Sequence, residues 1–293
     1  MPKSFTAKFA IALLVGLGVA VILSPFAAIA VSWAGFHFPF PRIFDRIVMI
    51  ALAVVVVISA RSLNAFSLLR KGFARPAANL TRAARGLAVA LAVMLLLFII
   101  AAAMEGFAHA GHAARMLPKY VLSAIAIAII EEGFFRAFLF GGMQTDFGRT
   151  TALVLSSAIY SVAHLVRAPV HFYVTSLDIT VGVRTLGLSF SQLSDPVSAL
   201  PTLLGLFLLG IVLAEAFVLT GTVWFSVGLH AGFVIGAKLW PKLMIAHSTL
   251  PGWLAGWGHQ PVISGAAAWI AALTVLILLR PLAGLGRDRP ART

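Results

Sequence analysis

The sequence predicts an all-α polytopic membrane protein with about eight transmembrane helices. Hydrophobic residues make up 61% of its 293 residues and charged residues only 11%, whereas a soluble domain is roughly 45–50% apolar and about 25% charged. Mean hydropathy is +1.02. Apolar runs near the roughly 20 residues needed to cross a bilayer recur along the whole chain. We therefore exclude a soluble globular protein and expect a single integral membrane domain over residues 1–293.

Eight apolar runs are bounded by charged residues, proline or glycine. They cover residues 9–33, 43–60, 86–104, 118–143, 150–167, 198–219, 222–238 and 262–280. The first run follows Lys3 and Lys8 and contains Ala28-Ile29-Ala30, which is similar to a signal-peptide cleavage site. Because this run is about 25 residues long and a signal core has roughly 7–15, we interpret it as a span.

The basic residues predict the topology and the partners of the chain. Lys and Arg outnumber Asp and Glu by 22 to 9. With both termini in the cytoplasm, 13 basic residues fall in cytoplasmic segments and 8 in outer segments, as the positive-inside rule requires for a cytoplasmic (plasma) membrane protein. The charges lie between apolar runs, so we expect the lipid bilayer as partner and no nucleic acid. The absence of cysteine excludes disulfides, thiolate metal sites and a cysteine nucleophile.

Residues 61–85 form a basic cytoplasmic loop in this topology. The segment carries six basic residues and no acidic residue, with Leu63, Phe66, Leu69 and Phe73 near helical spacing. This pattern is typical of a helix that lies on anionic lipid. A solvated positive loop that fixes the topology is the other interpretation.

Three charged residues interrupt the fourth apolar run, within the segment EEGFFR at residues 131–136. An ionisable group inside a span costs about 2.5–3.5 kcal/mol on insertion scales, so such groups indicate function. Glu132 and Arg136 are four residues apart and are predicted to form an ion pair on one helix face. Glu131 is predicted to point away from that pair and to act as a general base. The alternative is a structural ion cluster that specifies helix packing.

Two histidines inside other runs are the expected partners of these carboxylates. At a rise of about 1.5 Å per residue, Glu131, His164 and His230 can meet near the middle of the bilayer. His164 ends a polar stripe on the fifth run, so this helix face is predicted to contact protein or water; the stripe contains Ser157, Tyr160 and Ser161.

The sixth and seventh runs carry two further features. Gly228, Gly232 and Gly236 repeat at intervals of four in the seventh run, and small residues at this spacing allow another helix to approach closely. Glu215 lies near one end of the sixth run. We expect it to snorkel or to pair locally.

The polar residues of the fourth, fifth and seventh runs resemble motifs of the CAAX protease and bacteriocin-processing (CPBP, or Abi) family of intramembrane proteases, which is related to the Rce1-type CAAX prenyl proteases. EEGFFR at 131–136 is similar to the EExxxR motif of that family, YSVAH at 160–164 to its FxxxH motif, and GTVWFSVGLH at 221–230 to its last histidine motif. The resemblance covers roughly residues 118–240, with motifs on predicted helices 4, 5 and 7. It rests on the order and spacing of all three motifs.

The resemblance implies an eight-helix intramembrane endopeptidase that acts on a membrane-associated protein or peptide, with a prenylated CAAX-type C-terminus as one candidate. It implies that Glu131 and His164 activate water, that Glu132 and Arg136 support the site, and that His230 stabilises the oxyanion. The family has an asparagine four residues after the last histidine, where this chain has Val234. Loss of one oxyanion donor lowers a rate by about 10²–10³. Either His230 or a backbone N–H takes over that role, or activity is reduced.

Two questions stay open at this point: whether the site holds a metal ion, and which class of function the protein has. We favour a site without a cofactor, because the chain has no HExxH helix that would preset two histidine ligands. A zinc ion held by Glu131, His164 and His230 is the alternative. A non-proteolytic family relative, in bacteriocin immunity or as a scaffold, is kept open by Val234. A proton-coupled transporter is disfavoured because no internal repeat is visible.

Overall fold

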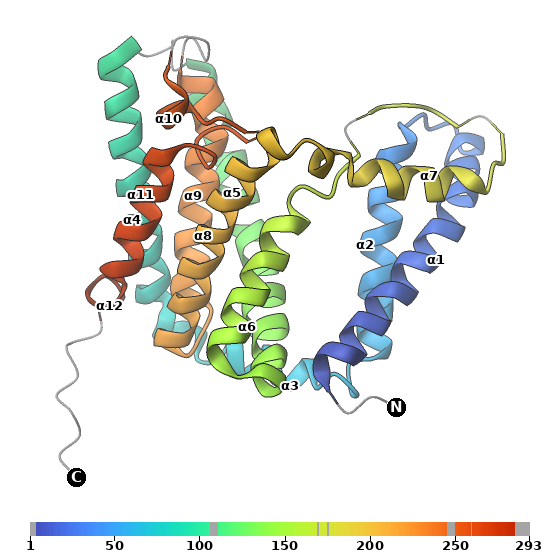
Figure 1. The fold of residues 1–293 in the computed structure, drawn as a ribbon, viewed down its shortest axis with the longest axis horizontal. Helices are drawn as coiled ribbons and strands as arrows, with labels where there is room; N and C mark the ends of the chain where they lie inside the picture. The colour runs from blue at the N-terminus through green and yellow to red at the C-terminus, as the bar shows by residue number, and fades with distance from the viewer. Residues whose placement is uncertain are drawn as a thin grey trace. The chain divides into compact units, whose positions relative to one another are not determined.

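The computed structural model describes residues 4–105, 111–168, 170–174, 176–244, 250–258 and 260–284, and in these ranges every regular element is a helix (Figure 1). Residue contacts divide the chain into two compact units. Unit 1 consists of residues 1–66 and 163–196, and unit 2 consists of residues 67–162 and 197–293. The predicted all-helical architecture is confirmed.

Unit 1 is built on two long helices and a shorter one. Its elements are α1 (Phe5–Trp33), α2 (Phe40–Ile58), α7 (Thr180–Ser189) and the 3₁₀ helix η2 (Ser191–Ser194). The side chain of Ser4 caps α1 by accepting a hydrogen bond of 3.2 Å from the N–H of Ala7. Ala28, Phe40, Phe44 and Val181 form the buried core between the three helices. Helix α1 is continuous through the segment that is similar to a cleavage site.

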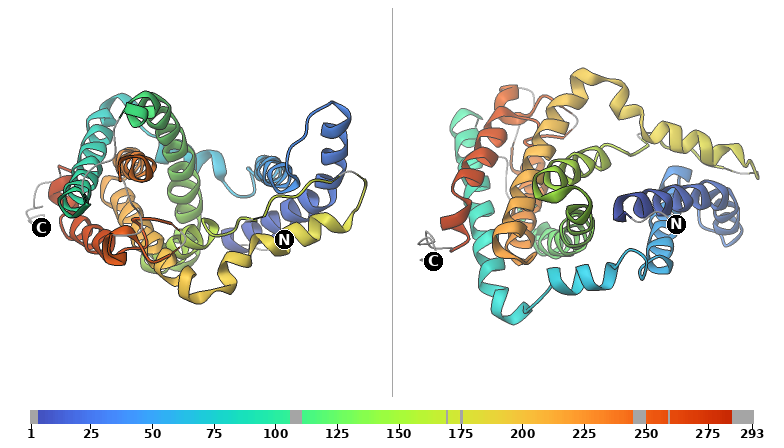
Figure 2. Two further views of the ribbon diagram at one scale, coloured as in Figure 1. Left: turned by 90° about the horizontal axis from the view of Figure 1, so that it is seen from above. Right: turned by 60° about the horizontal axis from the view of Figure 1, so that its bottom comes forward.

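Unit 2 holds the three motifs, except for His164, and is organised around α9. Helix α9 packs against α4 and α5, and its Phe225 and Leu229 share a buried core with Leu213 of α8 and Ala272 of α11. In the view from above, α9 lies among these neighbours (Figure 2, left). The elements are α3 (Ala65–Gly72), α4 (Pro76–Glu105), α5 (Gly111–Glu132), η1 (Gly133–Phe140), α6 (Gly141–Ala163), α8 (Pro196–Thr220), α9 (Trp224–Leu243), α10 (Gly252–Ala255), α11 (Ala266–Ile277) and α12 (Leu279–Leu282).

All eight predicted apolar runs contain a helix. Among the residues that the structure describes, three helices are long and apolar enough to cross a membrane: Phe5–Trp33, Pro76–Met104 and Pro196–Thr220. The shorter apolar helix Ala266–Ile277 lies in the eighth run. The total of eight spans stays a prediction.

Two of the differences between helix boundaries and apolar runs affect the reading of the chain. Helix α4 begins at Pro76 rather than at residue 86, since proline is well suited to the first turn of a helix and basic residues continue it. Residues 61–85 therefore contain α3 and the first turns of α4. The fourth and fifth runs lie in one helical stretch that is interrupted at Gly148, whose φ of 76° is a conformation that favours glycine.

The three glycines of α9 bring it into backbone contact with α4. A Cβ atom built on Gly228, Gly232 or Gly236 would lie 1.9–2.6 Å from an atom of α4. Real side chains essentially never approach this closely. The close helix approach predicted from the glycine spacing is confirmed.

We expect Gly228→Ala to destabilise the protein. Its new Cβ would lie 1.9 Å from the carbonyl oxygen of Ala83, a backbone atom that cannot rotate away. Overpacking of this kind costs about 1–3 kcal/mol, and the loss is measured as a lower unfolding midpoint in detergent. Gly18→Ala is the control, because no atom lies within 4 Å of a Cβ at that helical position. An unchanged midpoint for Gly228→Ala would contradict the packing described for these two helices.

Candidate active site

The acidic motif lies where the backbone changes from an α-helix to a π-helix. Glu131 and Glu132 are the last two residues of α5, and η1 begins at Gly133. At the other end of η1, the N–H of Gly141 bonds to the carbonyl oxygen of Arg136, five residues earlier. π-Helical turns are rare and frequently occur at functional sites. The motif is therefore held in an unusual backbone segment whose residues are almost all buried.

Glu132 and Arg136 form the ion pair that the sequence predicted. The Nε atom of Arg136 lies 3.3 Å from Oε2 of Glu132, and both side chains are almost fully buried. The Nη2 atom of Arg136 also donates to the carbonyl oxygen of Gly210 on α8, at 3.5 Å. The guanidinium carbon lies 4.6 Å from the ring centroid of Tyr160 on α6. These contacts compensate the desolvation of two buried charges.

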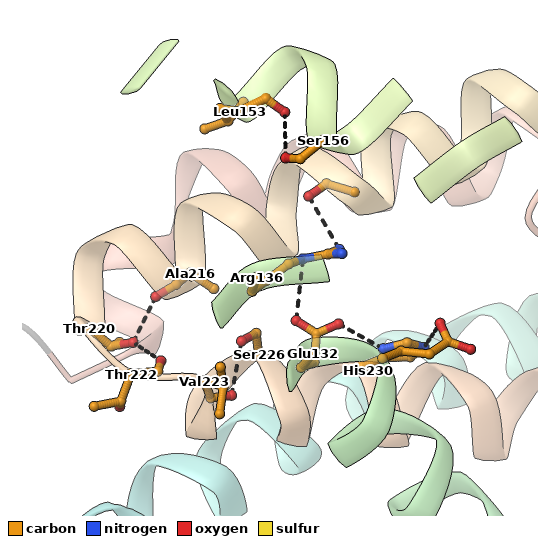
Figure 3. Close-up of polar contacts among 12 residues, drawn as sticks. Glu132, Arg136, Leu153, Ser156, Ala216, Thr220, Thr222, Val223, Ser226 and His230 are labelled. Carbon is orange, nitrogen blue, oxygen red and sulfur yellow. Dashed lines mark hydrogen bonds and ion pairs between the residues drawn. The ribbon is translucent and has the colours of Figure 1, made fainter. Parts of the chain in front are cut away.

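His230 on α9 completes a chain of polar contacts with this pair. Its Nδ1 lies 2.8 Å from Oε1 of Glu132, so Glu132 lies between Arg136 and His230 (Figure 3). Because Glu132 is the carboxylate of an ion pair, it accepts, and the Nδ1–H of His230 donates. The imidazole is buried and its edge faces the ring of Tyr160, with an interplanar angle of 82°. The ring orientation is thus fixed from two sides.

Glu131 is the more exposed of the two carboxylates, although its Oε2 atom is buried. Its side chain is 27% exposed, whereas that of Glu132 is 0% exposed. Its Oε2 lies 3.8 Å from Nε2 of His230, which is too far for a direct hydrogen bond. Both carboxylates contact the same imidazole. The spacing of residues along α5 predicts only the direction in which each side chain leaves that helix. It does not predict where α9 places the ring of His230.

His164 follows the last residue of α6 and is half-buried. It belongs to the segment that starts unit 1 again at Ala163, so its distance from the carboxylates stays a prediction. The polar stripe before it lies in unit 2, and Ser157, Tyr160 and Ser161 are all buried. The hydroxyl of Ser161 donates to the carbonyl oxygen of Leu203 on α8, at 2.7 Å. The prediction that this helix face contacts protein is confirmed.

The structure brings two of the three residues of the zinc alternative together. Glu131 and His230 are neighbours, and His164 belongs to the other unit. Within the part of the chain that the structure describes, no three His, Cys, Asp or Glu side chains are grouped closely enough to hold a metal ion. The distance of His164 from these two residues stays a prediction, and we derive no chemical step through a metal.

Two other residues singled out in the sequence lie apart from this cluster. Glu215 on α8 pairs with Arg149 on α6 at 2.5 Å, which is the pairing expected for it. Val234 lies one turn after His230 on α9 and is half-buried. Its apolar side chain cannot donate a hydrogen bond to an oxyanion.

Two contacts of the site were not predicted from the sequence. Tyr160 was predicted only as a member of the polar stripe and of the YSVAH motif, and its ring contacts both Arg136 and His230. The carbonyl group of Gly210 also contacts Arg136, and a backbone acceptor leaves no trace in residue identity. The burial of the stripe before His164 was the one available pointer to Tyr160.

Residues 113–236 match the model of a family described as type II CAAX prenyl endopeptidase Rce1-like. No curated protein and no solved structure matches the chain. The matched range contains Glu131, Glu132, Arg136, His164 and His230.

Proposed function

We propose that this chain, whose residues 113–236 belong to the type II CAAX prenyl endopeptidase Rce1-like family, is an intramembrane endopeptidase. Family membership agrees with the resemblance drawn from the three motifs. Together with helices long and apolar enough to cross a bilayer, it makes the chain an integral membrane protein. We place the protein in the cytoplasmic membrane, with both termini in the cytoplasm. Its substrate is a membrane-associated protein or peptide, and a prenylated CAAX-type C-terminus is the first candidate.

One observation carries this proposal: a partly exposed carboxylate faces an imidazole that is itself held by a buried ion pair. Oε2 of Glu131 and Nε2 of His230 are 3.8 Å apart. A water molecule within hydrogen-bonding distance of both atoms would be oriented by both. Glu132 and Arg136 fix the imidazole from its other side. A fixed base and a fixed second group are what general-base attack by water requires.

The proposed reaction starts with the removal of one proton from this water by Glu131. The oxygen of the water attacks the carbonyl carbon of the scissile peptide bond and forms a tetrahedral intermediate. As the C–N bond breaks, the proton held by Glu131 passes to the leaving nitrogen. The products are a new carboxyl group and a new amine, so one water molecule is consumed for each bond cleaved. His164 is proposed to assist Glu131 in activating the water.

His230 is proposed to serve the reaction through Nε2, since Nδ1 is occupied by Glu132. As a neutral ring it accepts a hydrogen bond from the attacking water. With one further proton taken from solvent, the ring becomes an imidazolium that donates from Nε2 to the oxyanion, and the Glu132 carboxylate stabilises this charge. The proton returns to solvent after the C–N bond has broken, so it is not consumed. An orienting carboxylate has the same role in serine protease triads. Because Val234 supplies no donor, His230 and backbone N–H groups carry the oxyanion stabilisation in this proposal.

The proposal is tested by incubating the purified protein in detergent with membrane-anchored peptides, with and without a prenylated CAAX C-terminus. We expect mass spectrometry to show cleavage of one internal peptide bond, and the same rate in the presence of a zinc chelator. Failure to cleave any peptide of the set would count against an endopeptidase. Loss of cleavage in the chelator, restored by zinc, would overturn the metal-free mechanism.

A non-proteolytic function is the second candidate, and Val234 is the residue that favours it. In that case the carboxylate cluster would have a structural role. The two candidates differ in one measurable respect, because a scaffold or immunity protein keeps its cellular effect when Glu131 is neutralised.

A further inference from the structure

A basic pocket of about 590 Å³ lies in unit 2, apart from the carboxylate cluster. It is formed by the connection between α3 and α4, the first turns of α4, the turn between α8 and α9, and residues 283–284, which follow α12. Four cationic side chains line it, and no acidic side chain does: Lys71, Arg75, Arg82 and Arg85. In the described ranges, none of the four forms an ion pair with a carboxylate. The pocket therefore concentrates uncompensated positive charge.

One of these arginines is held in place by the protein. Nη1 of Arg82 donates to Oδ1 of Asn79 at 2.7 Å and to the carbonyl oxygen of Thr220 at 3.4 Å. Asn79 is buried, and its amide donates to the carbonyl oxygens of Ala74 and Arg75. These hydrogen bonds hold the guanidinium group of Arg82, which lines the pocket. A guanidinium fork of this kind matches the oxygens of a phosphate group.

The pocket lies at the ends of helices that are apolar enough to cross a membrane. The apolar helix Pro76–Met104 begins at the pocket, and Pro196–Thr220 ends at it. A helix leaves the hydrocarbon layer where its apolar sequence ends, so the pocket is at the level of the lipid phosphates. Basic pockets between membrane helices are suited to anionic headgroups.

A second pocket, of about 230 Å³, adjoins the basic one. The two share Lys71 and Gly221 among their lining residues. The side chains that line the second pocket are mostly apolar and include Leu68, Phe140 and Phe217. A polar anion such as inorganic phosphate would leave this surface uncovered, whereas a lipid has an acyl chain to place there.

We propose that the basic pocket binds the phosphate group of an anionic membrane lipid, with the start of an acyl chain in the adjoining apolar pocket. Lys71, Arg75, Arg82 and Arg85 neutralise the phosphate. The site is separate from the carboxylate cluster, and binding there does not depend on peptide hydrolysis.

The test measures lipid binding to the full-length protein in neutral detergent by native mass spectrometry and by thermal shift. Dioleoylphosphatidylglycerol is the probe, dioleoylphosphatidylcholine is the zwitterionic control, and inorganic phosphate is the free anion. We expect selective retention of phosphatidylglycerol, and a higher unfolding midpoint in its presence. Inorganic phosphate should bind far more weakly, because it lacks the acyl chain.

The variant that tests the site is Arg75→Gln/Arg85→Gln. Both side chains are exposed, so their replacement should leave the fold intact. We expect phosphatidylglycerol to bind roughly ten- to thirtyfold more weakly, as two lost cations near a membrane surface predict. Arg61→Gln/Arg70→Gln is the matched control, because it removes the same charge from the same basic segment outside the pocket.

Equal weakening in both double variants would overturn the site, since it would mean that only the total charge matters. Equal binding of phosphatidylcholine would overturn the role of the phosphate charge. If inorganic phosphate bound as tightly as the lipid and displaced it, the lipid assignment would be overturned.

Discussion

Glu131→Gln should reduce peptide cleavage by at least about 10²–10⁴-fold, the usual contribution of a general base. Glutamine has nearly the same shape but cannot accept the proton of the attacking water. The side chain is partly exposed and lies outside the Glu132–Arg136 pair, so membrane insertion and the unfolding midpoint should change little. The rate of cleavage is measured on the purified variant by mass spectrometry.

Glu215→Gln is the matched control for this variant. Glu215 is also a partly exposed glutamate on an apolar helix, with a side chain 22% exposed, and its partner is Arg149. We expect near-normal cleavage from this control. If Glu131→Gln cleaved as fast as the wild type, or kept the full cellular effect of the protein, the scaffold function would replace the protease function.

Arg136→Met should produce the largest loss of stability. It leaves the carboxylate of Glu132 buried without its ionic partner, and breaking a buried pair on one side costs about 3–5 kcal/mol. The double variant Glu132→Gln/Arg136→Met removes both charges, so it should recover much of the unfolding midpoint. Cleavage should be lost in both variants: in the single variant Arg136 no longer holds the Glu132 carboxylate that orients His230, and in the double variant His230 has no charged partner at Nδ1. The unfolding midpoints and cleavage rates of the two variants test this.

Arg149→Met serves as the control for burial. The Arg149 side chain is 50% exposed in its pair with Glu215, and surface pairs contribute about 0–1 kcal/mol. Its midpoint should therefore stay close to that of the wild type. If Arg149→Met and Arg136→Met lowered the unfolding midpoint equally, the buried pair would have no special role. If the losses of Glu132→Gln and Arg136→Met added up in the double variant, the two charges would not be coupled.

The helices of this protein were predictable because the length of an apolar run is a direct consequence of bilayer thickness. The positions of the helix ends were not predictable, because a hydropathy profile ends a helix where the sequence becomes basic, even if the helix continues. Helix α4 illustrates this, since it starts at Pro76 and carries Arg82 and Arg85 in its early turns. The interruption between the fourth and fifth runs was predictable, and Gly148 provides it.

The site was predictable where it depends on one helix and not where it depends on several. The spacing of Glu132 and Arg136 sufficed to predict their ion pair. The place of His230 between Glu132 and Glu131 depends on how α9 packs against α5, which residue spacing does not contain. The π-helix after Glu132 has no sequence signature either, because it is a property of backbone hydrogen bonding.

The central claim, that water activated at Glu131 cleaves a peptide bond, is tested most directly by cleavage in water labelled with oxygen-18. The predicted result is one labelled oxygen in the new carboxyl terminus of the product made by the wild-type protein, and no such product from Glu131→Gln. An intact peptide with the wild type, or the same labelled product from both proteins, would contradict the account.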